Sequence, residues 1–376
     1  MSPASAIEAQ CKITARRDHL VTALSDAARV ANGKPIAVLG SLLAEIEADR
    51  LTWWATDTHI WRSGVVSVTA EQPGRGLVRV DVALAFLKRC PDGDVQLSIS
   101  AEQVVLKAGG FTAKMQSQPL ADFPTIPQVP SGGLSLSRAA LASAVGATTT
   151  IVASVAPTKY FLNGALFRVD DSAVTCVATD GHRLVKITVP HASIGQEVDT
   201  LLHREGLVEL DQMLENGPDA VTYQLHDNYH VFHVGEATLL TRPLEARFPA
   251  WERIITKTHK HEFTCDRAAW LACAQRVALA TVAERNAIHF EIKGGDLVLT
   301  AQSVEKGDAV DRVAATDIVG DAIGTSVSAR YLVDCLAGFD CDAVTCRIVD
   351  EVTQVLFVPA KSNGSDHLHV IMPMRL

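Results

Sequence analysis

The chain has 376 residues, of which 48% are hydrophobic and 20% are charged, so it is globular and long enough for two or three domains. Its formal net charge of −9 argues against a protein that coats DNA with its whole surface, although a locally basic inner lining stays compatible with it. The N-terminus shows no leader pattern and no apolar run approaches the ~20 residues of a membrane helix, so we expect a cytoplasmic protein without a membrane segment.

The cysteines show no metal-binding or redox spacing. None forms a CxxC pair, and no histidine pair stands near them at zinc spacing. We therefore expect reduced, buried thiols, with no metal and no cofactor. The eight positions are Cys11, Cys90, Cys176, Cys265, Cys273, Cys335, Cys341 and Cys346.

Three helical stretches begin in a similar way at intervals of a little over one hundred residues. They start at Asp18 (DHLVTALSDAARV), Ser137 (SRAALASAV) and Asp266 (DRAAWLACAQRVAL). Asp and Ser are favourable N-cap residues because a side-chain oxygen accepts a free backbone N–H. The apolar residues that follow have helical spacing, which predicts one helix at the start of each of three repeated units.

A strand pair follows each of these helices. The three sequences are LGSLLAEIEADRLTWWATD, LNGALFRVDDSAVTCVATD and IHFEIKGGDLVLTAQS, with turns predicted at Ala48–Arg50, Asp170–Ser172 and Gly294–Asp296. Alternating apolar residues on both sides of a polar or glycine turn indicate hairpins. The adjacent Trp53 and Trp54 are assigned to packing on the two faces of one strand.

Second helices are predicted from Asp81, His203 and Ser328, and each leads into a further strand: VQLSIS, VTYQLH or VTCRIV. The order of helix, strands, helix and strands therefore occurs three times. This indicates an α+β fold of three repeated domains, each with two helices on β-sheet, at residues 1–130, 131–256 and 257–376. Three units with unlike ends can close as a head-to-tail dimer of six units.

Two strings carry a family resemblance. ATDGHRLV spans Ala178–Val185, and VIMPMRL spans Val370–Leu376. With the threefold repeat, the chain resembles the bacterial DNA polymerase III beta subunit, the sliding clamp, from about Cys11 to Leu376. The resemblance implies a non-catalytic processivity factor of the nucleoid that forms a homodimeric ring around double-stranded DNA. It also implies that a peptide pocket tethers the polymerase III alpha subunit, the clamp loader and other proteins with a clamp-binding motif.

The resemblance also implies three sets of residues, carried over onto matching positions. The peptide pocket comprises Leu162, Thr179, Gly181, His182, Arg183, Leu184, Pro249, Arg253, Ile254, Val370, Ile371, Met372, Pro373, Met374, Arg375 and Leu376. The DNA-binding residues are Lys34, Lys159, Tyr160, Phe161 and Arg204. The dimer interface contains Ala113, Met115, Leu279 and Ala280. The two alanines are smaller than usual for clamps, from which we hypothesise a weaker or differently packed ring interface.

Alternative interpretations stay open at this point. Asp180, His182 and Arg183 suggest acid–base catalysis, but no nucleophile motif, Walker loop, HExxH or dinucleotide turn accompanies them, and a hairpin end explains them better. Tyr160 and Phe161 are equally well explained by strand packing, and the tail by a final edge strand. A clamp with a specialised role, encoded by a phage or plasmid or conferring inhibitor resistance, is the remaining alternative.

Overall fold

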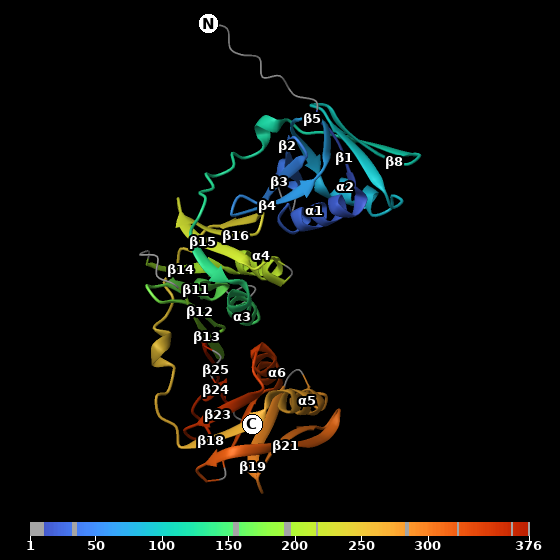
Figure 1. Cartoon of the computed structure of the whole chain (residues 1–376). Coiled ribbons are helices and arrows are strands. Elements are labelled where there is room, and N and C mark those ends of the chain that lie inside the picture. Colours follow the sequence, from blue (N-terminus) through green and yellow to red (C-terminus); the bar gives the residue numbers. More distant parts are fainter. Residues whose placement is uncertain are drawn as a thin grey trace. The chain divides into compact units, whose positions relative to one another are not determined.

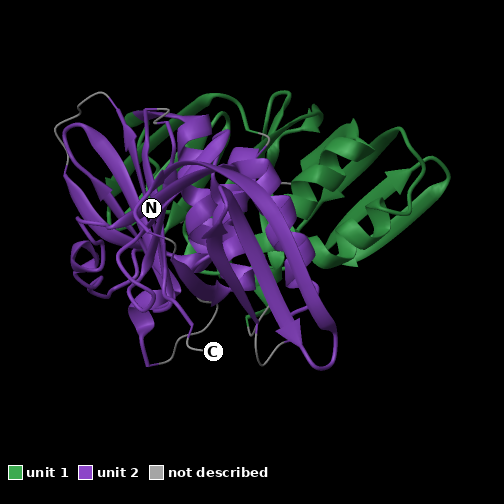
Figure 2. Cartoon of the chain, turned by 90° about the horizontal axis from the view of Figure 1, so that it is seen from below, with its two compact units in different colours: residues 1–134, 217–242 green, residues 135–216, 243–376 purple. Residues whose placement is uncertain are grey.

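The computed structural model describes residues 11–31, 36–152, 158–191, 197–215, 217–282, 286–321, 323–361 and 364–374. The chain divides into two compact units. Unit 1 contains residues 1–134 and 217–242, and unit 2 contains residues 135–216 and 243–376 (Figure 2). The last strands of the predicted middle domain thus group with the first domain, and the boundaries at 130 and 256 stay predictions.

The helices of the described residues form three pairs, as the repeat predicts. Within each pair the two helices pack against each other, α1 with α2, α3 with α4 and α5 with α6 (Figure 1). Their bounds are α1 (Arg17–Val30), α2 (Val80–Leu87), α3 (Arg138–Thr149), α4 (Arg204–Glu215), α5 (Arg267–Ala278) and α6 (Ala329–Gly338).

Two of the three predicted N-caps are confirmed. Ser137 accepts a hydrogen bond from the Ala140 amide, and Asp266 accepts one from the Ala269 amide at 2.7 Å. The prediction for Asp18 is wrong, because α1 begins at Arg17 and the N-cap position is two residues earlier, at Arg16, which makes no side-chain bond. Asp18 instead lies in the first turn, where a carboxylate favours the positive end of the helix dipole.

Unit 1 contains two antiparallel sheets, with strand orders β5-β1-β7-β8-β9 and β15-β16-β17-β4-β3-β2-β6. The strands are β1 (Cys11–Arg16), β2 (Ser41–Glu47), β3 (Arg50–Thr56), β4 (Ile60–Ser67), β5 (Thr69–Gln72), β6 (Gly74–Arg79), β7 (Asp94–Ile99), β8 (Gln103–Ala108), β9 (Phe111–Gln116), β15 (Ala220–His226), β16 (Tyr229–Val234) and β17 (Ala237–Thr241). The short strand β10 (Leu134–Ser137) spans the boundary of the units.

Unit 2 contains one sheet of twelve strands, in the order β14-β11-β12-β13-β25-β24-β23-β18-β21-β20-β19-β22. The strands are β11 (Gly164–Val169), β12 (Ala173–Thr179), β13 (Arg183–Pro190), β14 (Val198–His203), β18 (His261–Asp266), β19 (Ala287–Lys293), β20 (Asp296–Ser303), β21 (Gly307–Val319), β22 (Gly324–Ser328), β23 (Ala343–Ile348), β24 (Val355–Pro359) and β25 (Asp366–Ile371). Antiparallel pairing of β13 with β25 joins the middle part of the chain to its end.

The two faces of this sheet have different coverings. One face carries the helices (Figure 1). A core on this face is centred on Trp270, Phe263, Phe290 and Phe357, all at most 2% exposed. The other face carries a smaller apolar cluster covered by the connecting segment 243–260. Because successive side chains of a strand point to opposite faces, each residue of β13 and β25 belongs to one of these two environments.

The predicted packing roles of the tryptophans and thiols agree with the structure. Trp53 and Trp54 are both buried in β3. All eight cysteines are free, and seven of them are buried, with Cys341 half-buried. Burial raises the pKa of the Cys176 thiol to about 12, which keeps it protonated and unreactive at neutral pH.

Within the described residues, we find no helix that combines the length and the apolar character required to cross a membrane.

Candidate functional site

The segment from Thr179 to Arg183 forms a tight turn between β12 and β13 that is held by its own polar groups. Asp180 Oδ1 accepts hydrogen bonds from the amides of His182 and Arg183 at 2.9 and 3.0 Å. Thr179 Oγ1 accepts one from the Gly181 amide and donates one to the Arg183 carbonyl. Gly181 has φ +92°, a left-handed conformation that favours glycine.

This geometry explains the ATDGHR string as a structural turn rather than a catalytic site. Both carboxylate oxygens of Asp180 are engaged, because Oδ2 accepts from Arg183 Nε at 2.9 Å. His182 is exposed, with its main chain shaped by Asp180. A general base needs a free oxygen within reach of a substrate proton, and Asp180 offers none.

Leu184 and Val370 lie opposite each other on neighbouring strands, on the sheet face that the helices do not cover. Pairing of β13 with β25 places Leu184 opposite Val370 and Arg183 opposite Ile371. Leu184 and Val370 pack with Leu356 and with Trp251 and Phe248 of the connecting segment. Two predicted pocket residues, Leu184 and Val370, therefore contribute to one apolar layer, which Trp251 and Phe248, absent from the predicted set, complete.

Arg183 and Ile371 point to the opposite face. Ile371 belongs to the core under the helices, and the Arg183 side chain, 5% exposed, bonds to residues of α3 and α6. Neither side chain reaches the surface of the apolar layer. Sequence spacing could not reveal this, because it depends on the register of the pairing.

The tail is tied to the turn and to the edge of the sheet. The Met372 amide donates to the His182 carbonyl at 2.9 Å, and the Met374 amide donates to the Ser326 carbonyl at 2.7 Å. Met372 is 41% exposed, and Pro373 and Met374 border a cavity of about 330 Å³ with His289, Glu351 and Val352 among its lining residues. The edge-strand alternative for the tail is wrong, since β25 pairs with β13 and β24 on both sides. Arg375 and Leu376 lie outside the described residues.

The connecting segment completes the candidate pocket with a mixture of buried and exposed residues. The 3-10 helix η4 (Trp251–Arg253) buries Trp251 and leaves Arg253 exposed, and Ile254 is 36% exposed. Gln354 Nε2 donates to the Ile254 carbonyl at 2.7 Å, which fixes the segment to the third repeat. Pro249 lines a further cavity of about 540 Å³ between this segment and β11 and β14.

Of the predicted DNA-binding residues, Lys159 lies beside the turn of the candidate pocket, and Tyr160 and Phe161 follow it in the chain. Lys159 Nζ stands 3.8 Å from the place that a Cβ on Gly181 would occupy. Tyr160 begins the 3-10 helix η3 (Tyr160–Asn163) and is 52% exposed, whereas Leu162 is buried. Arg204 is half-buried at the start of α4. Lys34 lies outside the described residues.

The predicted dimer-interface residues differ in exposure. Ala113, Met115 and Ala280 are buried by their own unit, at 6%, 7% and 6% exposure. Leu279 at the C-cap of α5 is 76% exposed. Phe111, in the same strand as Ala113 and Met115, is 40% exposed at the start of β9 and packs its ring against Phe86.

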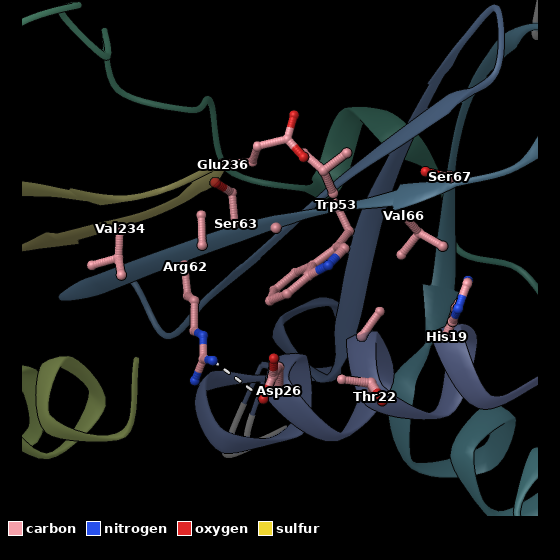
Figure 3. Close-up of a pocket in the computed structure, with 14 residues that line it drawn as sticks. His19, Thr22, Asp26, Trp53, Arg62, Ser63, Val66, Ser67, Val234 and Glu236 are labelled. Carbon is pink, nitrogen blue, oxygen red and sulfur yellow. Dashed lines mark ion pairs between the residues drawn. The ribbon is translucent and has the colours of Figure 1, made fainter. Parts of the chain in front are cut away.

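Unit 1 has a cavity of its own, of about 470 Å³, between α1, β4 and the turn that joins β16 to β17. Figure 3 shows Asp26 of α1 facing Arg62 of β4 across it, with a 3.2 Å ion pair between them. The indole of Trp53 fills the space above Gly64, where a Cβ would come within 2.8 Å.

In the parts of the chain that the structure describes, no group of three or more His, Cys, Asp or Glu side chains is arranged to hold a metal ion.

The fold defines a class: a protein of three repeated α+β units, with an apolar layer on one sheet face beside an ordered turn. Comparison with known proteins identifies the family. Models of the DNA polymerase III beta subunit match the N-terminal domain at residues 11–127, the central domain at 135–250 and the C-terminal domain at 252–375. The chain belongs to the DNA polymerase III beta subunit family, and it is a replication processivity factor without catalytic activity.

Individual relatives agree with this assignment. The beta sliding clamp of Escherichia coli K12 is 28% identical over 375 residues, covering 97% of this chain and 100% of its own. The crystal structure of the C. crescentus beta sliding clamp superposes with a TM-score of 0.86 at 25% identity, covering 98% of this chain and 100% of that one. The Bacillus subtilis clamp shares the fold, with a TM-score of 0.89 at 19% identity and coverage of 98% and 100%.

Proposed function

We propose that two copies of this chain close head to tail into a six-domain ring around double-stranded DNA. In this proposal, the pocket in unit 2 tethers the polymerase III alpha subunit, the clamp loader and other proteins that carry a clamp-binding motif. A closed ring is held on DNA by topology, so electrostatic contact with the phosphate backbone suffices and no base is read. The site of action is the nucleoid in the cytoplasm.

The observation that carries the tethering function is the juxtaposition of exposed and buried apolar groups at the turn. Met372 of the tail is 41% exposed and Ile254 of the connecting segment is 36% exposed, while Leu184 and Val370 are buried in the apolar layer that these two segments adjoin. An apolar layer with exposed apolar borders and a few fixed polar groups suits a short peptide with apolar anchors. Methionine adapts its shape to different partners, which fits a site shared among several proteins.

The test is binding of a fluorescent peptide that carries a glutamine followed by spaced leucines and a phenylalanine. We expect the full chain to bind it and a chain without Arg375 and Leu376 to bind much more weakly. Ile254→Ser should also weaken binding, whereas Val319→Ser, at a position that is 58% exposed in the same unit, serves as the matched control. Absence of binding by the intact chain would refute the tethering function.

Ring closure is supported by a junction that occurs twice within the chain. In each case, the strand that follows the repeat's hairpin pairs with the last strand of the next repeat. The strand β4 pairs with β17, with Ile60 opposite Thr241, and β13 pairs with β25, with Arg183 opposite Ile371. The third strand of this kind is β21, and the last strand of the first repeat is β9. We infer that β21 of one protomer pairs with β9 of its partner.

The repeat also gives the register of this pairing. The two-residue turn before β9 corresponds to the one before β17, which makes Met115 equivalent to Thr241. Gly307 is the first residue of β21, as Ile60 is of β4 and Arg183 is of β13, so these three residues are equivalent. Gly307 then lies opposite Met115, Asp308 opposite Lys114, and Ala309 opposite Ala113. Lys114 and Asp308 are both exposed, and opposite charges across a strand pair are favourable.

Apolar surface near these strands supports the same interface. Leu279, Phe111 and Val310 are 76%, 40% and 63% exposed. Each Å² of such surface buried on association contributes about 25 cal/mol. Ala113 and Ala309, opposite each other in the inferred pairing, add little buried apolar area, so the hypothesis of a weaker ring interface remains. A light-scattering mass near 40.3 kDa at micromolar concentration would support it, and a persistent dimer would contradict it.

A further inference from the structure

The guanidinium of Arg183 lies at the centre of a polar cluster on the helix side of unit 2. Its Nε donates to Asp180 Oδ2 at 2.9 Å, one terminal nitrogen donates to Asp334 Oδ2 at 2.7 Å, and the other donates to the Thr150 carbonyl at 2.8 Å. Its Cζ stands 4.4 Å from the centre of the Tyr331 ring. Only 5% of the side chain is exposed, so each of these partners compensates for lost hydration.

The partners of Arg183 come from three different elements. Asp180 belongs to the turn, Thr150 is the C-cap residue of α3, and Tyr331 and Asp334 lie on α6. Tyr331 and Asp334 are three residues apart on α6 and therefore face the same side. The cluster fixes α6 of the third repeat to the end of a helix and to a turn of the middle repeat.

The turn that Arg183 supports is the same one that holds the tail. Asp180 orders the His182 amide, and the His182 carbonyl accepts the Met372 amide at 2.9 Å. A chain of direct bonds therefore runs from Asp334 through Arg183 and Asp180 to His182 and Met372. No atom of Asp334 belongs to the apolar layer, yet its carboxylate is the fixed end of this chain.

We propose that Asp334, acting with Tyr331, is a positioning residue of the peptide site. It holds the Arg183 guanidinium in place. It thereby fixes the conformation of the turn from Thr179 to Arg183 and the position of Met372 beside the apolar layer of Leu184 and Val370. This inference rests on the proposed peptide-binding function. It assigns to α6 a contribution to peptide affinity without direct contact with the peptide.

The decisive variant is Asp334→Asn, which keeps the shape of the side chain and removes its charge. We expect the affinity for the fluorescent motif peptide to fall roughly three- to tenfold, the range typical of substitutions that act through intervening groups. The matched control is Glu291→Gln, which removes a similarly exposed carboxylate from Lys293 on β19 of the same unit. Glu291 is 28% exposed and Asp334 is 29% exposed, and the ion-pair partner of Glu291 lies on the same strand rather than in the turn, the tail or the connecting segment. Loss of the Glu291 carboxylate should lower stability and leave peptide affinity unchanged.

Amide hydrogen exchange separates positioning from a general loss of structure. In Asp334→Asn, protection should fall at the amides of His182, Arg183 and Met372 and stay unchanged in β19 and β20. If Asp334→Asn does not fold, Arg183→Lys is the second variant, since lysine retains the charge but cannot make the three directed bonds of the guanidinium. Equal peptide affinity in the wild type and in the folded variant would overturn the inference. No binding by the wild type would refute the proposed function instead.

Discussion

The β13–β25 ladder and the strand edges of β9 and β21 hold equivalent places in the repeat. They differ in the strand that pairs with them: β13 and β25 pair within one chain, whereas we infer that β9 and β21 pair between two chains. In the ladder, six consecutive residue pairs from Arg183–Ile371 to Thr188–Asp366 close the junction within one chain. From Gly307 to Ala314, β21 pairs with β20, and its pairing with β18 involves Ala315 and later residues. The same junction can therefore be built within a chain or between chains, and the second kind is the one whose stability depends on concentration.

Blocking the open edge should have the largest effect. Ala108 and Phe111 flank the two-residue turn between β8 and β9 and form a hydrogen-bonded pair. Because hydrogen-bonded and non-hydrogen-bonded pairs alternate, the backbone N–H and C=O groups of Thr112 and Lys114 point away from β8. Lys114→Pro removes one outward N–H donor from each of the two interfaces, and each lost hydrogen bond costs about 1.5 kcal/mol of association free energy. The total of ~3 kcal/mol corresponds to a Kd of dimerisation about a hundredfold larger. Analytical ultracentrifugation measures it, with Lys114→Thr as the control that keeps the N–H. An unchanged Kd for the proline variant would exclude β9 from the interface.

Reversing one charge tests the register of that edge. Lys114→Glu would face Asp308 with a like charge, at a cost of roughly 1 kcal/mol in each of two interfaces. We expect a Kd about thirtyfold larger, at low salt, where exposed charges are least screened. The double variant Lys114→Glu with Asp308→Lys should restore the dimer. Failure of this rescue would contradict the register while leaving the pairing of β9 with β21 possible in another alignment.

The closed ladder should respond to pH in a way that the open edge does not. Burial lowers the pKa of His367 on β25 to about 4, and its Nε2 lies 2.9 Å from that of His369. The unfolded chain takes up a proton near pH 6.5 while the folded chain does not, so stability is lost as the pH falls from about 6.5 toward 4. Between pH 7 and pH 5 we expect a loss of about 2 kcal/mol from this residue. Denaturant unfolding of His367→Gln should show a correspondingly smaller pH dependence; an identical slope would contradict the assignment.

Removing the ion pair of the closed ladder should have the smallest effect. Lys186 of β13 pairs with Asp366 of β25, whose side chain is 64% exposed. Lys186→Gln should cost about 0.5 kcal/mol, because the pair is partly screened and the strand pairing persists without it. Thermal unfolding compared with Lys293→Gln, which breaks an exposed pair with Glu291 outside the ladder, measures this cost. A loss of several kcal/mol would mean that side-chain charge, rather than pairing, holds the ladder.

The repeat, the hairpins and two of the helix caps were predictable because each depends on residues close in sequence. The caps at Ser137 and Asp266 need only the next three residues, and the turn at Gly181 needs only its own conformation. The orientation of Arg183 was not predictable, because it follows from pairing with Ile371 nearly two hundred residues away. The burial of Ala113, Met115 and Ala280 and the exposure of Phe111 likewise depend on packing that sequence spacing does not encode.

The burial of the native thiols gives the chain a chemical consequence. Seven of eight cysteines are buried, and burial raises the pKa of Cys265, Cys273 and Cys176 to about 12, so thiol reagents have little to attack at neutral pH. A cysteine placed at Thr112 or Val310, both exposed, would therefore be the dominant reactive position. Oxidation of a chain carrying both cysteines would cross-link the two protomers of the inferred ring at both interfaces. The covalently closed dimer would then differ from the monomer in electrophoretic mobility under denaturing conditions.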